Sequence, residues 1–344
     1  MRTTFNGIGK TADNIFMKRP TCIDLFAGAG GLSLGLKMAG WDALLAADYD
    51  AHACSTYRRN FPNVEALQGD IRNADWSAFK GKVDLVAGGP PCQPFSVAGN
   101  QKAHQDDRDM LPEYVRAVRE IRPKLLLMEN VAGLTTARHL PYFEEKLDEL
   151  KGLGYDLHFQ VLNASDYGVA QDRLRVIVLG GLKGKPAFPK KTHGIDGQPL
   201  VSAAAALAGV PADEPNNAIV TYAKNPVMRP SPFAGMLVNG GGRPIDLSKP
   251  SQTIPASAGG NRTHIIDEKG VLVEYHSYLM AGGAPRSGLV PEVRRLTLRE
   301  SARIQSFPDS FEFLGQRSAR YRQVGNAVPP LLGEAIGKAL LGAI

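Results

Sequence analysis

The amino-acid sequence predicts an α/β fold in which a doubly wound, mostly parallel sheet is followed by a second, smaller, loop-rich domain. In the first half of the chain, short apolar runs alternate with segments of helical period, and the runs end in a carboxylate, an amide or a glycine. From about residue 185 this alternation gives way to stretches rich in Gly, Pro, Ser and Asn. The chain has 344 residues, 43% of them hydrophobic, which is enough to bury a substantial core.

The apolar runs are expected to be parallel strands with helices on both faces of the sheet. They lie at 21–31, 43–50, 64–71, 83–91, 123–131 and 175–181, and the helical segments include 111–121 and 140–154. Because the carboxyl ends of parallel strands meet at one edge, the polar residues that end these runs should line one crevice. We expect residues 1–184 to form this first domain.

The second domain is expected to comprise residues 185–293, where 200–209 is the one candidate for a long amphipathic helix. Helical period returns at 296–307 and 329–344. Residues 181–344 contain 19 of the 40 Lys and Arg but only 12 of the 34 Asp and Glu. Such a basic excess suggests a polyanionic partner, although a solvated basic surface has the same composition.

Cysteine content and hydropathy exclude several classes of protein. The three cysteines, Cys22, Cys54 and Cys92, form no CxxC pair and have no histidine at ligand spacing, so we expect neither a disulfide framework nor a metal. The N-terminal segment lacks the apolar core of a signal peptide, and no later run is long enough to span a membrane. We therefore expect a cytoplasmic protein without a membrane partner.

A glycine turn follows the first predicted strand, in "DLFAGAGGLSLGL" (24–36). Glycines such as Gly28 and Gly30 let the backbone pass close to a ligand at the N-terminus of the next helix. The next strand ends at Asp48, about twenty residues further on, where a carboxylate can accept from two ribose hydroxyls. The pattern indicates a nucleoside-containing cofactor, although Ser33 replaces the third glycine of GxGxxG, and a dehydrogenase or a purely structural turn stays open.

The third predicted strand ends beside further candidates for the same pocket. Asp70 can accept from an adenine amino group, while Ile71 and Tyr49 offer apolar and aromatic surface to the ring. Together with Asp48, these residues form a set that suits adenosine.

The stretch "GGPPCQPFSVAG" (88–99) sets Cys92 just past the end of the fourth predicted strand. Pro90 and Pro91 fix φ and remove two backbone donors, so the thiol is held in place before a substrate arrives. A lone cysteine is more often an inert core residue, but this one faces the predicted crevice.

Polar residues at the next two strand boundaries extend this group. Glu129 and Asn130 end the fifth predicted strand, and Gln171, Arg173 and Arg175 alternate into the sixth, so one strand face presents all three. A carboxylate at a strand end is most often satisfied by its neighbours alone. Three polar side chains at the edge of a buried strand nevertheless need partners.

These motifs resemble those of the bacterial, S-adenosylmethionine-dependent cytosine-C5 DNA methyltransferases, and they occur in that family's order. They are "DLFAGAGG", "GDI", "GGPPCQPFS", "ENV", "QDRLR", "RRLTLRESARIQSFPDSF" (294–311) and "QVGNAVPP" (323–330). The match runs from about residue 21 to 335, apart from roughly 185–293. Asp48 stands where the family usually has glutamate, and Tyr49 where tryptophan is common. The resemblance implies a class I methyltransferase fold, which is Rossmann-like.

By this resemblance the protein is a DNA (cytosine-5-)-methyltransferase of a restriction–modification or related system. A target cytosine is flipped from the duplex, Cys92 adds to its carbon 6, and carbon 5 then accepts a methyl group from S-adenosylmethionine. Glu129 is implied to hold N3 of the base, and Asn130 to orient Glu129.

Three further residues are implied at the target base. Arg175 contacts O2 near the thiolate, and Arg173 lies beside it, since cationic neighbours favour a thiolate. The Pro90 carbonyl, being left free, accepts from the cytosine amino group.

The resemblance also assigns the ligand-binding residues. Asn326 and Ala327 complete a cofactor pocket whose full set is Asp24, Phe26, Gly28, Gly30, Asp48, Tyr49, Asp70, Ile71, Asn326 and Ala327. Residues 96–109 look like a loop that closes behind the base, and residues 249–264 resemble the segment that reads DNA sequence. The expected DNA contacts are Ser96, Lys102, Arg243, Thr253, Asn261, Arg262 and Arg286. The resemblance implies that residues 294–344 link the two domains, with Arg294 and Arg299 as ties, and end in a helix that returns to the first domain.

The first domain is thus expected to bind the cofactor and carry out catalysis, and the second to recognise the target. The expected partners are double-stranded DNA, bound by a monomer, and a companion restriction endonuclease. Methylation of RNA is one alternative, against which the large variable region argues. A non-catalytic DNA-binding relative is another, against which the presence of Cys92 and Glu129 argues, and a dehydrogenase has no use for these two residues.

Overall fold

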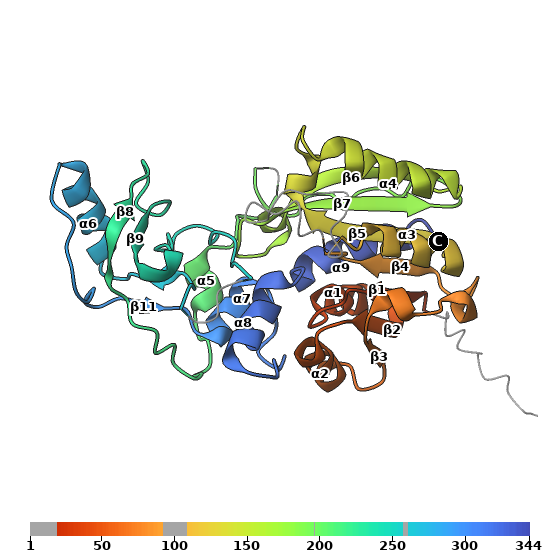
Figure 1. Cartoon of the computed structure of the whole chain (residues 1–344), viewed down its shortest axis with the longest axis horizontal. Helices are drawn as coiled ribbons and strands as arrows, with labels where there is room; N and C mark the ends of the chain where they lie inside the picture. The colour runs from red at the N-terminus through yellow and green to blue at the C-terminus, as the bar shows by residue number, and fades with distance from the viewer. Residues whose placement is uncertain (1–18, 92–108, 196, 257–260) are drawn as a thin grey trace, which may run out of the picture.

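A computed structural model describes residues 19–91, 109–195, 197–256 and 261–344 of the chain (Figure 1). In these ranges the main feature is a seven-stranded sheet with the order β3-β2-β1-β4-β5-β7-β6. Its strands are β1 (Thr21–Leu25), β2 (Asp42–Asp48), β3 (Glu65–Gln68), β4 (Leu85–Gly88), β5 (Leu125–Val131), β6 (Asp156–Asn163) and β7 (Leu174–Gly181). Strands β1 to β5 are parallel, whereas β7 is antiparallel to both of its neighbours. The prediction of a mostly parallel α/β sheet is confirmed.

Strand β6 and the direction of β7 are not predicted by the sequence. Only Leu157 and Leu162 of β6 are buried, because β6 is an edge strand, so it has no apolar run that would identify it. β6 and β7 form a hairpin, which makes β7 run opposite to the parallel strands. The prediction that the end of 175–181 lines the crevice is therefore wrong. The start of β7 lies there, with Arg175 opposite Val131 at the end of β5.

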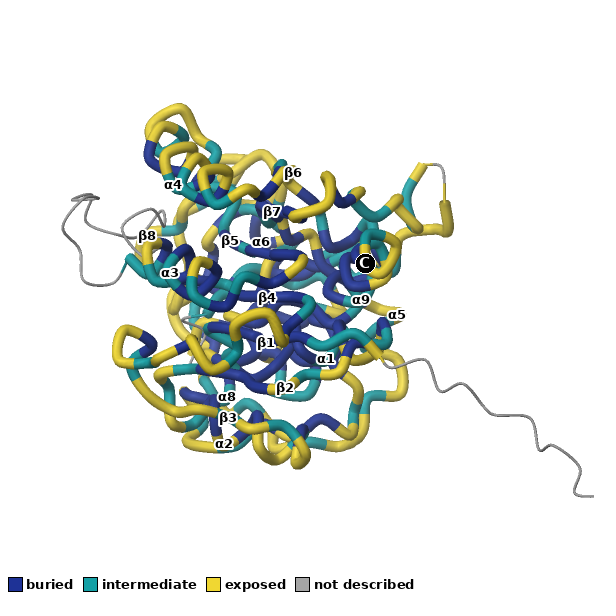
Figure 2. The backbone as a smooth tube through the Cα atoms, turned by 90° about the vertical axis from the view of Figure 1, so that its right-hand side faces the viewer, coloured by how far each residue is buried: buried dark blue, intermediate teal, exposed yellow. Residues whose placement is uncertain are grey.

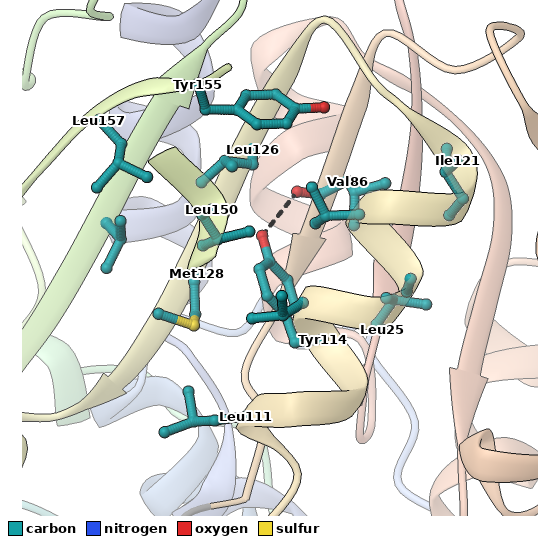
Figure 3. Packing of buried hydrophobic residues seen from close by; sticks show 14 of the residues in the cluster. Leu25, Val86, Leu111, Tyr114, Ile121, Leu126, Met128, Leu150, Tyr155 and Leu157 are labelled. Atoms are coloured by element: carbon teal, nitrogen blue, oxygen red, sulfur yellow. Dashed lines mark hydrogen bonds between the residues drawn. The ribbon is translucent and has the colours of Figure 1, made fainter. Parts of the chain in front are cut away.

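Helices cover both faces of the sheet. α1 (Gly31–Ala39) and α9 (Pro330–Leu341) pack against each other on one face, and α3 (Leu111–Ile121) and α4 (Leu140–Gly152) cover the other. Figure 2 shows the central strands buried between these layers, which is why they read as continuous apolar runs. Figure 3 shows Tyr114 of α3 directed at the sheet, where its hydroxyl donates to the carbonyl of Val86 in β4 at 3.2 Å.

An aromatic cluster ties the sheet to the C-terminal part of the chain. α2 (Ala51–Asn60) contributes Tyr57, whose ring stacks on Phe61 with centroids 4.5 Å apart. These rings pack against Phe307, Phe311 and Phe313, which lie between α7 (Leu298–Ile304) and α8 (Arg317–Asn326). The cluster holds α8 next to the ends of β1 and β2.

The region beyond the large sheet contains two small antiparallel sheets and short helices. Its elements are α5 (Ala203–Leu207), β8 (Tyr222–Val227), β9 (Met236–Val238), β10 (Ile265–Ile266), α6 (Val271–Met280) and β11 (Arg294–Arg295), with β8 paired to β9 and β10 to β11. In Figure 1, α6, β8 and β9 lie at the end of the molecule away from the large sheet. The expectation of no long amphipathic helix outside 200–209 is not contradicted by α6, which is apolar at most positions and so shows no helical period, and within 200–209 only α5 is helical.

The segment that follows residue 294 begins within this second region. Leu296 and Ile304 share a core with Ala203, Ile245 and Ile266, and the chain then passes through α8 to α9 on the large sheet. The division at 184 and 293 stays a prediction. None of the helices in the described ranges is long and apolar enough to cross a membrane.

Candidate active site

A cavity of about 570 Å³ opens at the carboxyl edge of the large sheet. Its wall comes from the ends of β1, β2 and β5, the residues that follow β4, the start of β7, and segments 253–256 and 322–328. Most of the predicted catalytic and cofactor residues line it, together with one predicted DNA contact: Asp24, Phe26, Gly28, Asp48, Tyr49, Pro90, Glu129, Asn130, Arg173, Arg175, Thr253, Asn326 and Ala327. An adjoining hollow of about 430 Å³ shares Tyr49 with the cavity and adds Asp70 and Ile71. Such volumes are typical of small-molecule sites.

The glycine turn after β1 leaves space on the cavity side. Gly28 has a φ of +56°, and a Cβ there would meet no atom of the described residues within 4 Å, so a ligand can approach its backbone closely. Gly30 differs, because a Cβ on it would stand 2.6 Å from the ring of Phe61. Gly30 lies outside the lining of the cavity, and its lack of a side chain serves the packing of α1 against α2.

Asp48 fixes the turn from the end of β2. One of its carboxylate oxygens accepts from the backbone N–H of Gly28 and the other from that of Asp50, both at 2.8 Å. Burial raises the pKa of Asp48, and the two N–H donors oppose this rise. Each oxygen keeps a lone pair for a further donor in the cavity.

The residues expected at an adenine ring are arranged unequally. The ring of Tyr49 is 77% exposed at the mouth of the cavity, and Ile71 is buried. The carboxylate of Asp70 is bound by Arg72 at 2.6 Å, and this hydrogen bond lowers the pKa of Asp70. Asp70 thus has a partner before any ligand arrives.

Asp24 is a buried carboxyl in the wall of the cavity, only 1% exposed. Its Oδ2 accepts from the hydroxyl of Ser33 at 2.5 Å, and Ser33 in turn accepts from the hydroxyl of Tyr57 at 2.9 Å. Its Oδ1 has no hydrogen-bond partner in the described part of the chain. Burial raises the pKa of Asp24 to about 7, and the nearby Asp48 carboxylate adds to this rise. The hydrogen bond from Ser33 acts in the opposite direction.

An ion pair joins β5 and β7 inside the cavity. The Nε of Arg175 lies 2.8 Å from Oε1 of Glu129, and the two side chains are only 13% and 12% exposed. The side chain of Asn130 makes no hydrogen bond to Glu129 among the described residues, so its expected role in orienting this carboxylate stays a prediction. Its amide donates to the Pro90 carbonyl at 2.8 Å, while its Oδ1 accepts from Val131 N–H, because the side chain turns back to its own loop.

We expected the Pro90 carbonyl to be free, but it already has a hydrogen-bond partner. It accepts from Asn130 and keeps a second lone pair. Pro91 borders the same cavity. Cys92 follows directly in the sequence but lies outside the described residues, as do Ser96 and Lys102.

Arg173 lines the same cavity as Arg175 but is almost completely buried. It is 1% exposed, and its guanidinium donates to the carbonyls of Ile254 and Gly325. Burial, with a contribution from Arg175, holds its pKa well below the usual range, and Glu129 opposes this.

The remaining predicted DNA contacts are spread over the second region. Asn261 and Arg262 are exposed, and Arg243 is half-buried. Arg286 lies over the rings of Tyr275 and Tyr278 of α6, with its guanidinium carbon 5.4 and 4.9 Å from the ring centroids. Thr253 alone of this set borders the cavity, and its hydroxyl donates to the carbonyl of Asp172.

The side chains of the two predicted ties between domains bind within their own segment, and the adjacent Arg295 binds within the second region. Arg294 pairs with Glu300 six positions away, and Arg299 donates to carbonyls of its own segment at 309 and 311. Arg295 is the buried one of the two adjacent arginines, and it donates to the carbonyls of Thr263 and Asn239. On a two-residue strand the sequence carries no signal for which arginine faces inwards.

Arg322, which was not predicted as a site residue, also lines the cavity and pairs with Asp50 at 2.7 Å. Its place one residue before "QVGNAVPP" is the only signal for it in the sequence. No group of three His, Cys, Asp or Glu side chains that could hold a metal ion occurs among the residues described.

The chain matches the family model of the C-5 cytosine-specific DNA methylases over residues 20–227 and 244–342. Among curated relatives, the type II methyltransferase M1.HphI of Haemophilus parahaemolyticus is 37% identical over 95% of this chain and 88% of its own. The type II methyltransferase M.XorII of Xanthomonas oryzae is 34% identical, over 95% and 86%.

Two solved structures share the fold. One is a putative DNA modification methyltransferase encoded within an Escherichia coli prophage, with a TM-score of 0.66, 24% identity and coverage of 94% of this chain and 99% of that one. The other is a Spodoptera frugiperda DNMT2 mutant, with a TM-score of 0.68, 21% identity and the same coverage. At these identities the likeness concerns the fold alone.

Proposed function

The chain belongs to the family of C-5 cytosine-specific DNA methylases, and from this membership we propose how its residues divide the work of the reaction. It is a DNA (cytosine-5-)-methyltransferase, similar to those of type II restriction–modification systems. The methyl donor in this proposal is S-adenosylmethionine, and the substrate is a cytosine flipped out of double-stranded DNA. A companion restriction endonuclease is part of the same proposal, supported by the type II relatives.

The residues of the cavity fit this cofactor. The open side of Gly28 admits a ligand close to the backbone, and the unpartnered Oδ1 of Asp24 and the carboxylate of Asp48 suit hydroxyl or cationic groups. When bound, S-adenosylmethionine supplies an electrophilic methyl group on a positively charged sulfur. The residues proposed to hold it are Asp24, Phe26, Gly28, Asp48, Tyr49, Asp70, Ile71, Asn326 and Ala327.

Cys92 is proposed as the nucleophile because carbon 5 of cytosine is too weak a nucleophile by itself. Its thiolate forms a bond to carbon 6, which turns the ring into an enamine that accepts a methyl group at carbon 5. Loss of the proton from carbon 5 then expels the thiolate and restores the aromatic ring. Pro90 and Pro91, which border the cavity, direct the chain that carries Cys92.

Glu129 is proposed to hold a proton at N3 while negative charge builds on the ring. The single observation that carries the assignment is its 2.8 Å pair with Arg175, inside the cavity that Pro91 borders. Arg175 sets the position of the carboxylate and supplies a cation near the base. The Pro90 carbonyl, with one lone pair left, accepts from the cytosine amino group.

Residues 185–293 are proposed to read the DNA sequence, with residues 1–184 carrying the chemistry. The basic excess of residues 181–344 supports this division. The proposed DNA contacts within residues 185–293 are Arg243, Thr253, Asn261, Arg262 and Arg286. Ser96 and Lys102 are proposed to contact DNA from the first domain. Binding as a monomer has to offset the few kcal/mol that flipping a base costs.

A substitution of the proposed nucleophile tests the mechanism. Cys92→Ser should abolish methyl transfer and leave binding of S-adenosylhomocysteine intact. Cys22→Ala is the matched control, because the Cys22 thiol is buried in β1, which raises its pKa and keeps it unreactive. This control should keep full activity.

Duplex DNA with 5-fluorocytosine at the target provides a second readout. Its fluorine cannot leave as a proton does, so the wild-type enzyme should be trapped on it covalently and Cys92→Ser should not. Methyl transfer by Cys92→Ser, or no trapping of the wild type, would overturn the assignment of Cys92. The target itself is found by expressing the protein in a methylation-free host and mapping 5-methylcytosine.

A further inference from the structure

Arg173 is a buried cation without a carboxylate partner in the described ranges. It is 1% exposed, its Nε has no hydrogen-bond partner there, and its neighbour Arg175 takes the nearby carboxylate of Glu129. Burying an unpaired charge is costly, so a side chain of this kind persists where its hydrogen bonds hold other parts of the structure in place.

The two groups that Arg173 binds belong to different walls of the cavity. Its Nη1 donates to the carbonyl of Ile254 at 3.4 Å and its Nη2 to that of Gly325 at 2.8 Å. Ile254 belongs to residues 253–256, which we name the anchor segment. Gly325 belongs to residues 324–327, which we name the closing segment. Both segments line the cavity.

The anchor segment is bound along the approach to β7. The side-chain oxygen of Gln171 accepts from the N–H of Ile254 at 2.9 Å, and the hydroxyl of Thr253 donates to the carbonyl of Asp172 at 2.7 Å. Arg173 continues this series by one residue and reaches past the anchor segment to Gly325.

The two segments also touch directly, through glycine. A Cβ on Gly325 would stand 2.5 Å from the carbonyl oxygen of Pro255, a distance that real Cβ atoms do not show. The close contact and the shared guanidinium therefore fix the separation between the closing segment and the anchor segment.

We propose that Arg173 is a positioning residue that serves two binding sites at once and does not contact the target base. The proposal rests on the proposed function, in which the closing segment carries the cofactor residues Asn326 and Ala327 and the anchor segment carries the DNA contact Thr253. Both guanidinium Nη groups are engaged by backbone carbonyls, so the side chain acts by holding these segments together. Loss of Arg173 then weakens the cofactor site and the DNA site together.

The test measures both affinities on the full-length chain. S-adenosylhomocysteine is titrated by calorimetry, and a duplex that carries the mapped target is titrated by fluorescence anisotropy. Arg173→Ala should weaken each by about tenfold, since two charged hydrogen bonds are lost. Guanidinium at a concentration far below denaturation should restore both affinities with one concentration dependence.

Arg295→Ala is the matched control, since Arg295 is an equally buried arginine that binds two carbonyls of the second region only. It should weaken DNA binding, leave S-adenosylhomocysteine binding unchanged, and so separate local positioning from a general loss of stability. Gly325→Ala is a second route to the same result, because it separates the two segments without altering Arg173. Gly325→Ala should weaken the binding of both ligands, and it tests the proposal even if Arg173→Ala does not fold.

The outcomes are distinct. If Arg173→Ala or Gly325→Ala weakens only one ligand, or if guanidinium restores only one affinity, the two-site role is refuted. If both affinities persist while kcat alone falls, Arg173 acts on the base instead. A wild-type chain that binds neither probe would overturn the proposed function itself.

Discussion

Asp24→Asn should flatten the dependence of folding stability on pH. The carboxyl is 1% exposed, and its pKa is raised by burial from 3.8 to about 7. Between these pH values the folded chain keeps a proton on Asp24 that the unfolded chain has released. The free energy of unfolding should therefore fall as pH rises from about 4 to 7, and then level off.

The magnitude follows from the two pKa values. At about 1.4 kcal/mol for each pH unit, the wild-type chain should lose up to about 4 kcal/mol through Asp24 over this interval. An asparagine keeps the acceptor for the Ser33 hydroxyl but carries no proton to lose. The free energy of unfolding of the variant minus that of the wild type should therefore be larger above about pH 7 than at about pH 4.

Urea denaturation across this range measures the effect without any ligand. Ser33→Ala provides the opposite shift: it removes a hydrogen bond that lowers the pKa of Asp24, so the decline should extend to higher pH. Asp48, whose pKa is also raised by burial, contributes a residual slope in Asp24→Asn. Parallel stability curves for wild type and Asp24→Asn would refute the reasoning, because the carboxyl would then be ionised alike in both states.

Three further outcomes are expected. Glu129→Ala and Arg175→Met should each lower the free energy of unfolding by about 1–3 kcal/mol and together by less than their sum, since each alone leaves a largely buried charge unpaired; additive losses in a double-mutant cycle would contradict the pair. Gly35→Ala, whose Cβ would stand 2.4 Å from a backbone oxygen of α9, should cost about 2 kcal/mol or more, whereas Gly152→Ala has open space and should be neutral or stabilising by up to about 1 kcal/mol; equal Tm values would disprove the contrast. Arg262→Ala should relax the preference at one base position by about 1–3 kcal/mol, and a methylome with an unchanged motif at lower efficiency would assign Arg262 to phosphate instead.

The parallel part of the sheet was predictable because both of its faces are covered. Strands such as β4 and β5 are buried on both sides, so they read as continuous apolar runs with a polar end, as "LLLMENV" does. Edge strand β6 has two buried residues and no such run. The sequence pattern therefore identified the central strands and the edge strand β3, and missed the other edge strand, β6.

The site was predictable at the level of which residues meet, but not of which atoms they bind. Strand ends converge by topology alone, and this placed Asp48 and Glu129 in one cavity, whereas Arg175 was assigned to it by the family resemblance. The partner of each side chain depends on distances of a few ångströms in loops. Two details could therefore not be predicted. Asn130 donates to Pro90 and not to Glu129, and Arg295 is buried whereas the adjacent Arg294 lies at the surface.

The hairpin of β6 and β7 explains how two arginines only two residues apart do different work. Because β7 starts at the carboxyl edge of the parallel strands, Arg175, within the strand, lies beside the end of β5 and meets Glu129. Arg173 comes one residue before β7 begins and so lies outside the sheet, where its side chain reaches the segments that close the cavity. A parallel β7 would carry both arginines to the opposite edge, about 20 Å away for strands of this length. The antiparallel strand that the sequence pattern did not reveal is thus the element on which both arginines depend for their place in the site.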